Sequence, residues 1–171
     1  MSIPDGPGER LAALGDELIE IHTWLREELA GLRADVERQL DGRGERPRRL
    51  KAHCLSFCSA LTRHHTGEDG GAFPALAGSF PELAPTIAKL EEDHELISVV
   101  QHDLERLLEG MAAEPDAAEV ARVLSALDGL TAILESHFAF EERRIVTALN
   151  ALSAEAGTAE SLLGLPAPNG A

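Results

Sequence analysis

Apolar residues recur at steps of three and four along the first part of the chain, the spacing that places them on one face of an α-helix. The series comprises Leu11, Leu14, Leu18, Ile21, Leu25, Leu29, Leu32, Val36 and Leu40. It predicts an amphipathic helix from about residue 8 to residue 40. The next residues, DGRGERP, are rich in glycine and end on Pro47, which a first helical turn tolerates. They predict a connection and the start of a second helix.

Three further stretches carry the same helical spacing. Their stripes are Leu50, His53 or Cys54, Phe57, Leu61, His64 and Glu68; Ile87, Leu90, His94, Ile97, Gln101, Leu104 and Leu108; and Val120, Val123 or Leu124, Leu127, Leu130, Leu134, His137, Glu141, Ile145 and Leu149. Gly67, Gly70 and Gly71 predict a weak end to the second helix, because glycine costs about 1 kcal/mol relative to alanine in a helix interior. The stretch AGSFPELAP then predicts a loop, and Pro85 the opening of the third helix.

The last residues, SAEAGTAESLLGLPAPNGA, are small and aperiodic and predict a weakly ordered tail, in which Leu162, Leu163 and Leu165 could dock on the rest of the protein. Four long helices with short connections and no strand pattern predict an all-α fold, an up-down-up-down antiparallel four-helix bundle. We therefore expect one bundle domain over residues 1–152 and a tail over residues 153–171.

Composition limits the possible partners of the chain. Fifteen Lys and Arg against thirty Asp and Glu give a net charge of −15, which repels the phosphates of nucleic acids and anionic lipid headgroups. No apolar run approaches the roughly eighteen residues needed to span a membrane, and the start MSIPDGPGER lacks the regions of a signal peptide. We expect a cytoplasmic protein that binds neither nucleic acid nor membrane.

Composition also limits the chemistry. Tyrosine is absent, which excludes a tyrosyl radical. Cys54 and Cys58 lie four residues apart on one predicted helix, where a disulfide would be strained, so we interpret them as reduced and mostly buried thiols.

Two copies of one pattern, His64-x-x-x-Glu68 and His137-x-x-x-Glu141, lie inside helical stripes. Residues four apart share a helix face, so each pair presents an imidazole beside a carboxylate. His22 and His94 fall on the stripes of the other two helices. A single buried histidine is usually an ordinary core residue. Buried carboxylates, however, cost several kcal/mol unless they are paired or bind a metal, so the whole set predicts a metal site with two ions.

Imidazole and carboxylate ligands without thiolate suit iron, manganese or zinc. Ferritin-like di-iron bundles carry a Glu-x-x-His unit on each of two helices. Here Glu91-x-x-His94 matches that unit once, whereas Leu134 stands three residues before His137. The ferritin-like alternative therefore fails on half of its motif.

The chain resembles the hemerythrin-like, or HHE cation-binding, domains over roughly residues 10–150. The matching elements are His22, His64-His65-x-x-Glu68-Asp69 followed by Phe73-Pro74, Asp93-His94, and His137-Phe138-x-x-Glu141-Glu142. This resemblance implies a non-haem di-iron centre with two iron ions, in which Glu68 and Glu141 are bridging carboxylates. It also implies that His22, His64, His94 and His137 are terminal ligands, and that O2, peroxide or NO binds at an open position.

The chain departs from the oxygen-carrying hemerythrins at two places. These proteins have a second histidine four residues after the histidine of helix three, where this chain has Ser98. They also place an Asp five residues after the last histidine, where Glu142 stands here and Glu141 at four is the better match. A further group could complete the site. The candidates are Glu91 and, with lower priority, His102, His65 and His53.

Three functions fit these observations. The first is a di-iron protein that binds or processes a small diatomic or peroxide ligand. The second is an oxidase or oxygenase acting on an organic substrate, which would need a substrate-sized pocket near Gly67, Phe57 and Phe138. The third is an iron or redox sensor, which the glycines at the end of the second helix would favour.

Overall fold

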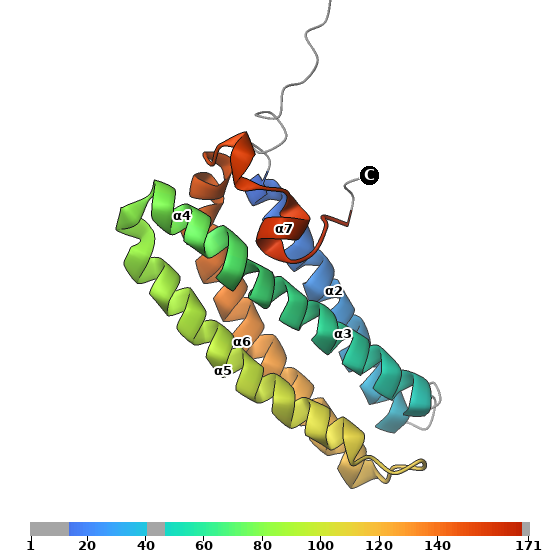
Figure 1. Ribbon diagram of the computed structural model, residues 1–171. Coiled ribbons are helices and arrows are strands. Elements are labelled where there is room, and N and C mark those ends of the chain that lie inside the picture. The colour runs from blue at the N-terminus through green and yellow to red at the C-terminus, as the bar shows by residue number, and fades with distance from the viewer. Residues whose placement is uncertain (1–13, 41–46, 169–171) are drawn as a thin grey trace, which may run out of the picture.

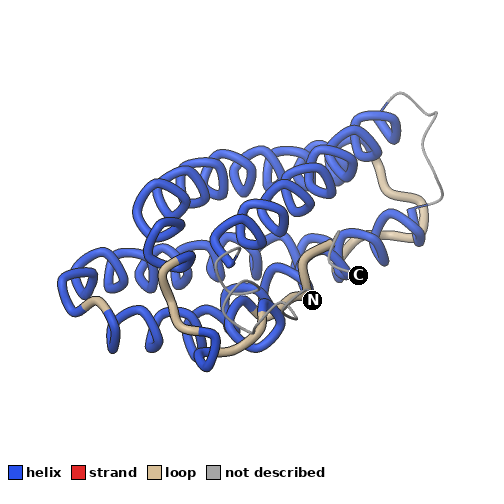
Figure 2. The backbone as a smooth tube through the Cα atoms, turned by 90° about the horizontal axis from the view of Figure 1, so that it is seen from above, coloured by secondary structure: helices blue, strands red, loops and turns tan. Residues whose placement is uncertain are grey.

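The protein is described by a computed structural model that covers residues 14–40 and 47–168. Within these residues the chain is all-helical, with no strand. Its long helices are α2 (Leu14–Leu40), α3 (Pro47–Gly67), α5 (Ala84–Glu109) and α6 (Ala117–Asn150). Figure 2 shows these helices lying alongside one another. The first residues of the helix predicted from residue 8, and most of the DGRGERP connection, lie outside the described residues.

The leucine-rich stripes of the long helices face one core. Helix α2 packs against α6 and α3, while α5 packs against α6 and α3 (Figure 1). Residues such as Leu18, Leu61, Leu104 and Leu130 are fully buried, as the helical spacing of the sequence predicts. No helix in the described part of the chain is long and apolar enough to cross a membrane.

The second helix does not end at its glycines, and this prediction is wrong. Helix α3 continues through a π turn, η1 (Glu68–Ala72), into α4 (Phe73–Ser79), and the short 3-10 turn η2 (Pro81–Leu83) leads into α5. The Phe73 amide donates to the Glu68 carbonyl five residues back, as expected for a π turn. Part of the stretch predicted to be a loop is therefore helical. Tertiary packing against the C-terminal segment outweighs the low helix propensity of glycine here.

The tail also differs from the prediction of weak order. It contains the 3-10 turn η3 (Ala154–Ala156) and helix α7 (Ala159–Leu163), which begins with a capping box between Thr158 and Ser161. Gly164 ends α7 in the left-handed conformation, with φ of 76°. Leu162, Leu163 and Leu165 are buried, so the suggestion that these leucines dock is confirmed. Burial on the bundle orders a segment whose own sequence has no helical period.

The expectation of an all-α fold is therefore confirmed for the described residues, which include four long helices. The shorter helices α4 and α7 add to this frame and lie toward one end of it (Figure 1).

Candidate metal centre

The residues of the two His-x-x-x-Glu pairs, with His22 and His94, meet in the middle of the bundle. His22 comes from α2, His64 from α3, Glu68 from η1, His94 from α5, and His137 and Glu141 from α6. None of these six residues is more than 5% exposed. The structure thus brings together every residue that the sequence singled out as a principal metal ligand.

Each carboxylate of the cluster lies between two imidazoles. The Glu68 carboxylate is 3.2 Å from His64 Nε2 and 3.3 Å from His94 Nε2. The Glu141 carboxylate is 3.3 Å from His22 Nε2 and 3.4 Å from His137 Nε2. A carboxylate placed between two imidazoles can offer one oxygen to an ion on either side.

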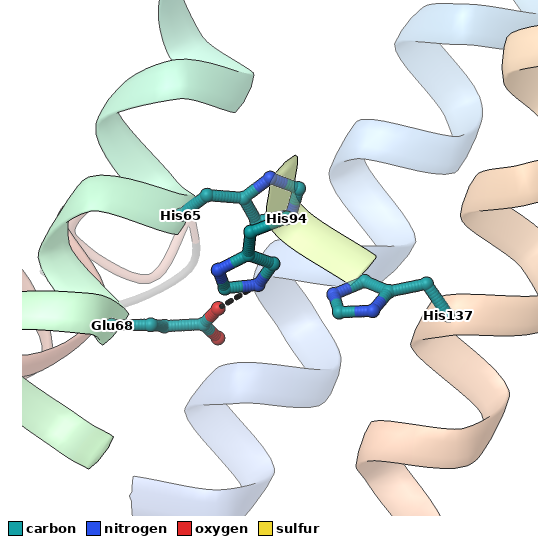
Figure 3. Close-up of side chains that lie close together, drawn as sticks. All are labelled: His65, Glu68, His94 and His137. Atoms are coloured by element: carbon teal, nitrogen blue, oxygen red, sulfur yellow. Dashed lines mark ion pairs between the residues drawn. The ribbon is translucent and has the colours of Figure 1, made fainter. Parts of the chain in front are cut away.

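The ligand atoms fall into two groups, each compact enough to hold one ion, with atoms within 4.8 Å of one another. The first group is His22, His64, Glu68 and Glu141, and the second is His65, Glu68, His94 and His137. Figure 3 shows the second group, with the imidazoles of His65, His94 and His137 around the Glu68 carboxylate. Glu68 belongs to both groups, whereas Glu141 belongs only to the first.

Four of the imidazoles are held through their outer nitrogen, Nδ1. The acceptors are Glu142 for His22 at 3.2 Å, the Leu163 carbonyl for His64 at 2.7 Å, Asp69 for His94 at 2.8 Å and Asp93 for His137 at 3.4 Å. An acceptor at Nδ1 keeps the ring proton there and leaves a lone pair on Nε2. All four Nε2 atoms then face the centre of the bundle as electron-pair donors.

The inward-facing atoms lack the partners that buried polar groups need. His65, His94 and His137 Nε2 and all four oxygens of Glu68 and Glu141 are buried without a hydrogen-bond partner. His22 Nε2 and His64 Nε2 face each other at 3.1 Å, so two lone pairs would repel unless a proton or a cation lies near them. Leaving so many polar atoms unpaired is costly. The donor set therefore fits bound cations.

Burial sets the protonation of the imidazoles. It lowers the pKa of His64 to about 3, and it also lowers the pKa of His65 and His137. His22 differs, because its contacts with Glu141 and Glu142 outweigh burial and raise its pKa. Most of the cluster histidines are therefore neutral at physiological pH, which is the form that binds a metal ion.

The pKa values of the two glutamates are shifted in opposite directions. Burial, together with repulsion from Glu141, raises the pKa of Glu68 well above its usual value. Burial would also raise the pKa of Glu141, but its contacts with His22 outweigh that effect and lower the pKa. Burial thus favours the protonated form of Glu68, and the contacts with His22 favour the charged form of Glu141.

His65, which the sequence analysis ranked low as a ligand, lies buried beside the cluster. Its side chain is 6% exposed and its ring stacks on that of His94, with centroids 4.0 Å apart. His65 and Ser98 line the same cavity, and Ser98 stands where the oxygen carriers have a histidine on helix three. The ring of His65 belongs to one of the two groups of potential ligand atoms.

The other candidates for an additional ligand do not reach the cluster. Glu91, His53 and His102 are exposed. His53 instead contacts Glu28 at 3.0 Å, and His102 lies 3.4 Å from the Ser98 hydroxyl. His53 therefore lies at the surface and not in the core.

The roles of Asp69, Asp93 and Glu142 were not recognised from the sequence. Each stands next to a cluster residue in the chain, and each contacts the Nδ1 of a histidine from another helix. Arg26 in turn donates to Glu142 at 2.9 Å. An acidic residue directly beside a candidate ligand was the available signal. The Leu163 carbonyl, a backbone group, had none.

Two cavities border the cluster. One, of about 330 Å³, is lined by Thr62, His65, Thr66, Asp69, His94, Glu95, Ser98 and Gln101. The other, of about 480 Å³, is lined by Lys89, Asp93, Leu96, Ala132, Ile133, Ser136, His137, Phe140 and Arg143. The smaller cavity reaches two imidazoles of the second group, so it connects that group with the surface between α3 and α5.

Comparison with known proteins agrees with this geometry. The family model of the hemerythrin HHE cation binding domain matches residues 14–149, which include all the cluster residues. No match was found among curated proteins or among solved structures. The family match agrees with the helices of the chain and with its buried histidines and glutamates. The chain therefore belongs to the hemerythrin HHE cation-binding family.

Proposed function

We propose that the chain holds a non-haem di-iron centre and uses it to bind or process a small ligand such as O2, H2O2 or NO. The observation that carries the proposal is the position of Glu68, which is shared by two groups of ligand atoms. His22 and His64 would hold one iron, and His65, His94 and His137 the other, with Glu68 and Glu141 between them. The long helices, in up-down-up-down order, form the frame.

The donor chemistry supports iron. The cluster offers imidazole and carboxylate groups, which suit iron, manganese and zinc. Thiolates are not available, because burial raises the pKa of Cys54 to about 11 and that of Cys58 to about 12. The resemblance to hemerythrins favours iron among these metals. When bound, iron would supply electrons and an open coordination position for the ligand.

The surroundings of the cluster support a small ligand. Phe138 stacks on His22 with centroids 4.0 Å apart, and Phe73 stacks on His94 at 5.4 Å, so aromatic rings exclude water from two sides. The 330 Å³ cavity reaches His65 and His94 through polar residues that include Thr62 and Ser98. Asp69 and Glu95 at this cavity would repel anions, which favours neutral ligands.

The alternative functions find less support. An oxidase acting on an organic substrate would need a pocket near Gly67, Phe57 and Phe138, and neither cavity described above is lined by these residues. The sensor hypothesis relied on a poorly ordered end of the second helix, and that segment is a continuous π turn.

Metal analysis combined with optical spectra tests the proposal. We expect about two iron ions per chain, because one cation cannot satisfy both groups of ligand atoms. The reduced protein would then be exposed in turn to O2, H2O2 and NO. Charge-transfer bands that reverse on degassing would indicate carriage, and consumption of peroxide with release of O2 would indicate catalase-like chemistry. A reproducible ratio of one iron or less, or zinc alone, would contradict the di-iron centre.

Replacing His65 by alanine should weaken binding of one ion and spare the other. The side chain belongs only to the group of His94 and His137, so the ion between His22 and His64 keeps its ligands. We expect a loss larger than the roughly 10- to 100-fold typical of groups that only orient a ligand. Anaerobic Fe(II) titration measures it, with His102→Ala, a change at an exposed histidine, as the control. Equal affinities in His65→Ala and wild type would remove His65 from the ligand set.

A further inference from the structure

The C-terminal segment lies directly against η1, the turn that carries Glu68 of the cluster. We call residues 158–165 the C-terminal latch. Its helix α7 contacts η1, α3 and α2, and Figure 1 shows it beside α3 toward one end of the bundle. The buried side chains of Leu162 and Leu163 anchor it. A segment about 90 residues away in the chain thus contacts both α3, which carries His64, and η1, which carries Glu68.

Glycines allow the two backbones to touch. A Cβ on Gly67 would lie 2.3 Å from Gly164 Cα, and one on Gly164 would lie 1.9 Å from the Arg63 carbonyl oxygen. A Cβ on Gly71 would lie 2.7 Å from the Ser161 carbonyl oxygen. Gly67 has helical dihedrals, with φ of −62° and ψ of −43°, so its conformation does not require glycine. Glycine at position 67 instead leaves the space that the backbone of the C-terminal latch occupies.

This close approach places one polar group at the metal cluster. The Leu163 carbonyl accepts from His64 Nδ1 at 2.7 Å. The last carbonyls of a helix have no partner within it, so the end of α7 has an acceptor to offer. The corresponding acceptors for His22, His94 and His137 are carboxylates on α5, α6 and η1, which belong to the bundle itself. His64 alone among these four histidines is oriented by a separate segment.

We propose that docking of the C-terminal latch and binding of the ion at His64 and His22 are coupled, with the Leu163 carbonyl as the positioning group. This inference rests on the two-ion centre proposed above. With the latch docked, His64 keeps its proton on Nδ1 and directs Nε2 inward. With the latch released, the ring can rotate or change tautomer, and the ion loses an oriented ligand.

The latch is suited to such coupling because it is short. Helix α7 has five residues, too few to be stable without tertiary contacts. Its docked state therefore depends on the leucines, on the glycine contacts and on the bond to His64. By linkage, an ion that holds His64 in place must stabilise the docked latch by the same factor by which the latch strengthens ion binding.

A matched pair of glycine variants in the full-length chain tests the coupling. In Gly67→Ala the new methyl group meets the latch backbone, whereas in Gly70→Ala, in the same turn, it meets nothing within 4 Å. We expect anaerobic Fe(II) titrations against a competing chelator to show about a 10- to 100-fold loss of affinity for one ion in Gly67→Ala, as when other groups that orient a metal ligand are lost. The second ion, held by His65, His94 and His137, should bind as in wild type. Gly70→Ala should match wild type for both ions.

Hydrogen exchange of the wild-type chain provides a measurement that needs no variant. Amides of residues 158–165 should exchange faster after removal of metal, and in Gly67→Ala they should exchange fast with or without it. Two tightly bound ions in Gly67→Ala, or latch exchange that does not respond to metal, would overturn the coupling alone. A wild-type chain that binds fewer than two ions would overturn the proposed centre, and the coupling with it.

Discussion

Replacing Glu68 by glutamine is expected to abolish tight binding of both ions. Glu68 is the residue shared by the two groups of ligand atoms, and its carboxylate lies 3.2 Å from His64 and 3.3 Å from His94. Glutamine keeps the size of the side chain but removes the negative charge and one of the two oxygen ligands. Because this loss removes a ligand from both ions, it should exceed the roughly 10- to 100-fold effect of losing a group that only orients a ligand. Metal content after chelator challenge measures it.

The control for this variant is Glu95→Gln. Glu95 is exposed on α5 and lines the 330 Å³ cavity without belonging to either group of ligand atoms. The Glu95→Gln variant removes the same charge from the same side of the bundle. It therefore distinguishes the loss of a metal ligand from the effect of a changed net charge. Retention of two ions in Glu68→Gln, or an equal loss in Glu95→Gln, would show that Glu68 does not bridge the centre.

Removing the metal should lower the free energy of unfolding by several kcal/mol. The apo protein keeps seven inward-facing N and O atoms of the cluster without hydrogen-bond partners, and leaving buried charges uncompensated costs about 3–5 kcal/mol where one partner is lost. Binding free energy of the ions adds to folding free energy, because the unfolded chain has no assembled site. Urea unfolding of the holo and apo forms at pH 7.5, followed by circular dichroism, measures the difference.

The free energy of unfolding should depend on pH, and the sign of this dependence follows from the lowered pKa values of His64, His65 and His137. Below about pH 6.5 the unfolded chain takes up protons on these histidines, while the folded chain does not until their lower pKa values are reached. Stability is therefore complete above about pH 6.5 and falls as the pH drops toward the folded pKa values. The raised pKa values of His22 and Glu68 act in the opposite direction. The lowered pKa values of Glu141 and Glu142 act in the same direction as those of the three histidines. Unfolding midpoints that are equal at pH 7.5 and pH 5.5, in both forms, would contradict this prediction.

The long helices and the principal cluster residues could be predicted from the sequence because both depend on local pattern. Leucines spaced by three and four define each buried face, and His22, His64, His94 and His137 interrupt those faces at positions where an apolar residue would otherwise stand. A polar residue in an apolar stripe is buried, so it needs a hydrogen-bond partner or a metal ion that the neighbouring apolar residues do not provide. The structure shows that these interruptions lie at one level of the bundle.

The remaining features depend on contacts between segments far apart in the chain. Gly67 and Gly71 have the local signature of a helix end, yet they stay helical because the latch packs where side chains would be. His65 lies about 100° around the helix from His64, and that its ring points inward is evident only from its stacking on His94 of another helix. The Leu163 carbonyl is a backbone group, which every residue has, so no residue type marks it in the sequence. No periodicity within one helix encodes such information.

The π turn at Glu68–Ala72 also matters for how this chain is aligned with its relatives. In an uninterrupted α-helix, residues four apart share a face, but across this turn the Phe73 amide reaches back five residues, so Glu68 and Phe73 share the buried side. The segment is in effect a helix with one inserted residue. Gly70, exposed and with open space beside it, is the position at which a shorter relative could lack a residue and keep both its glutamate and its phenylalanine inward. A gap at this place is therefore compatible with an unchanged metal centre.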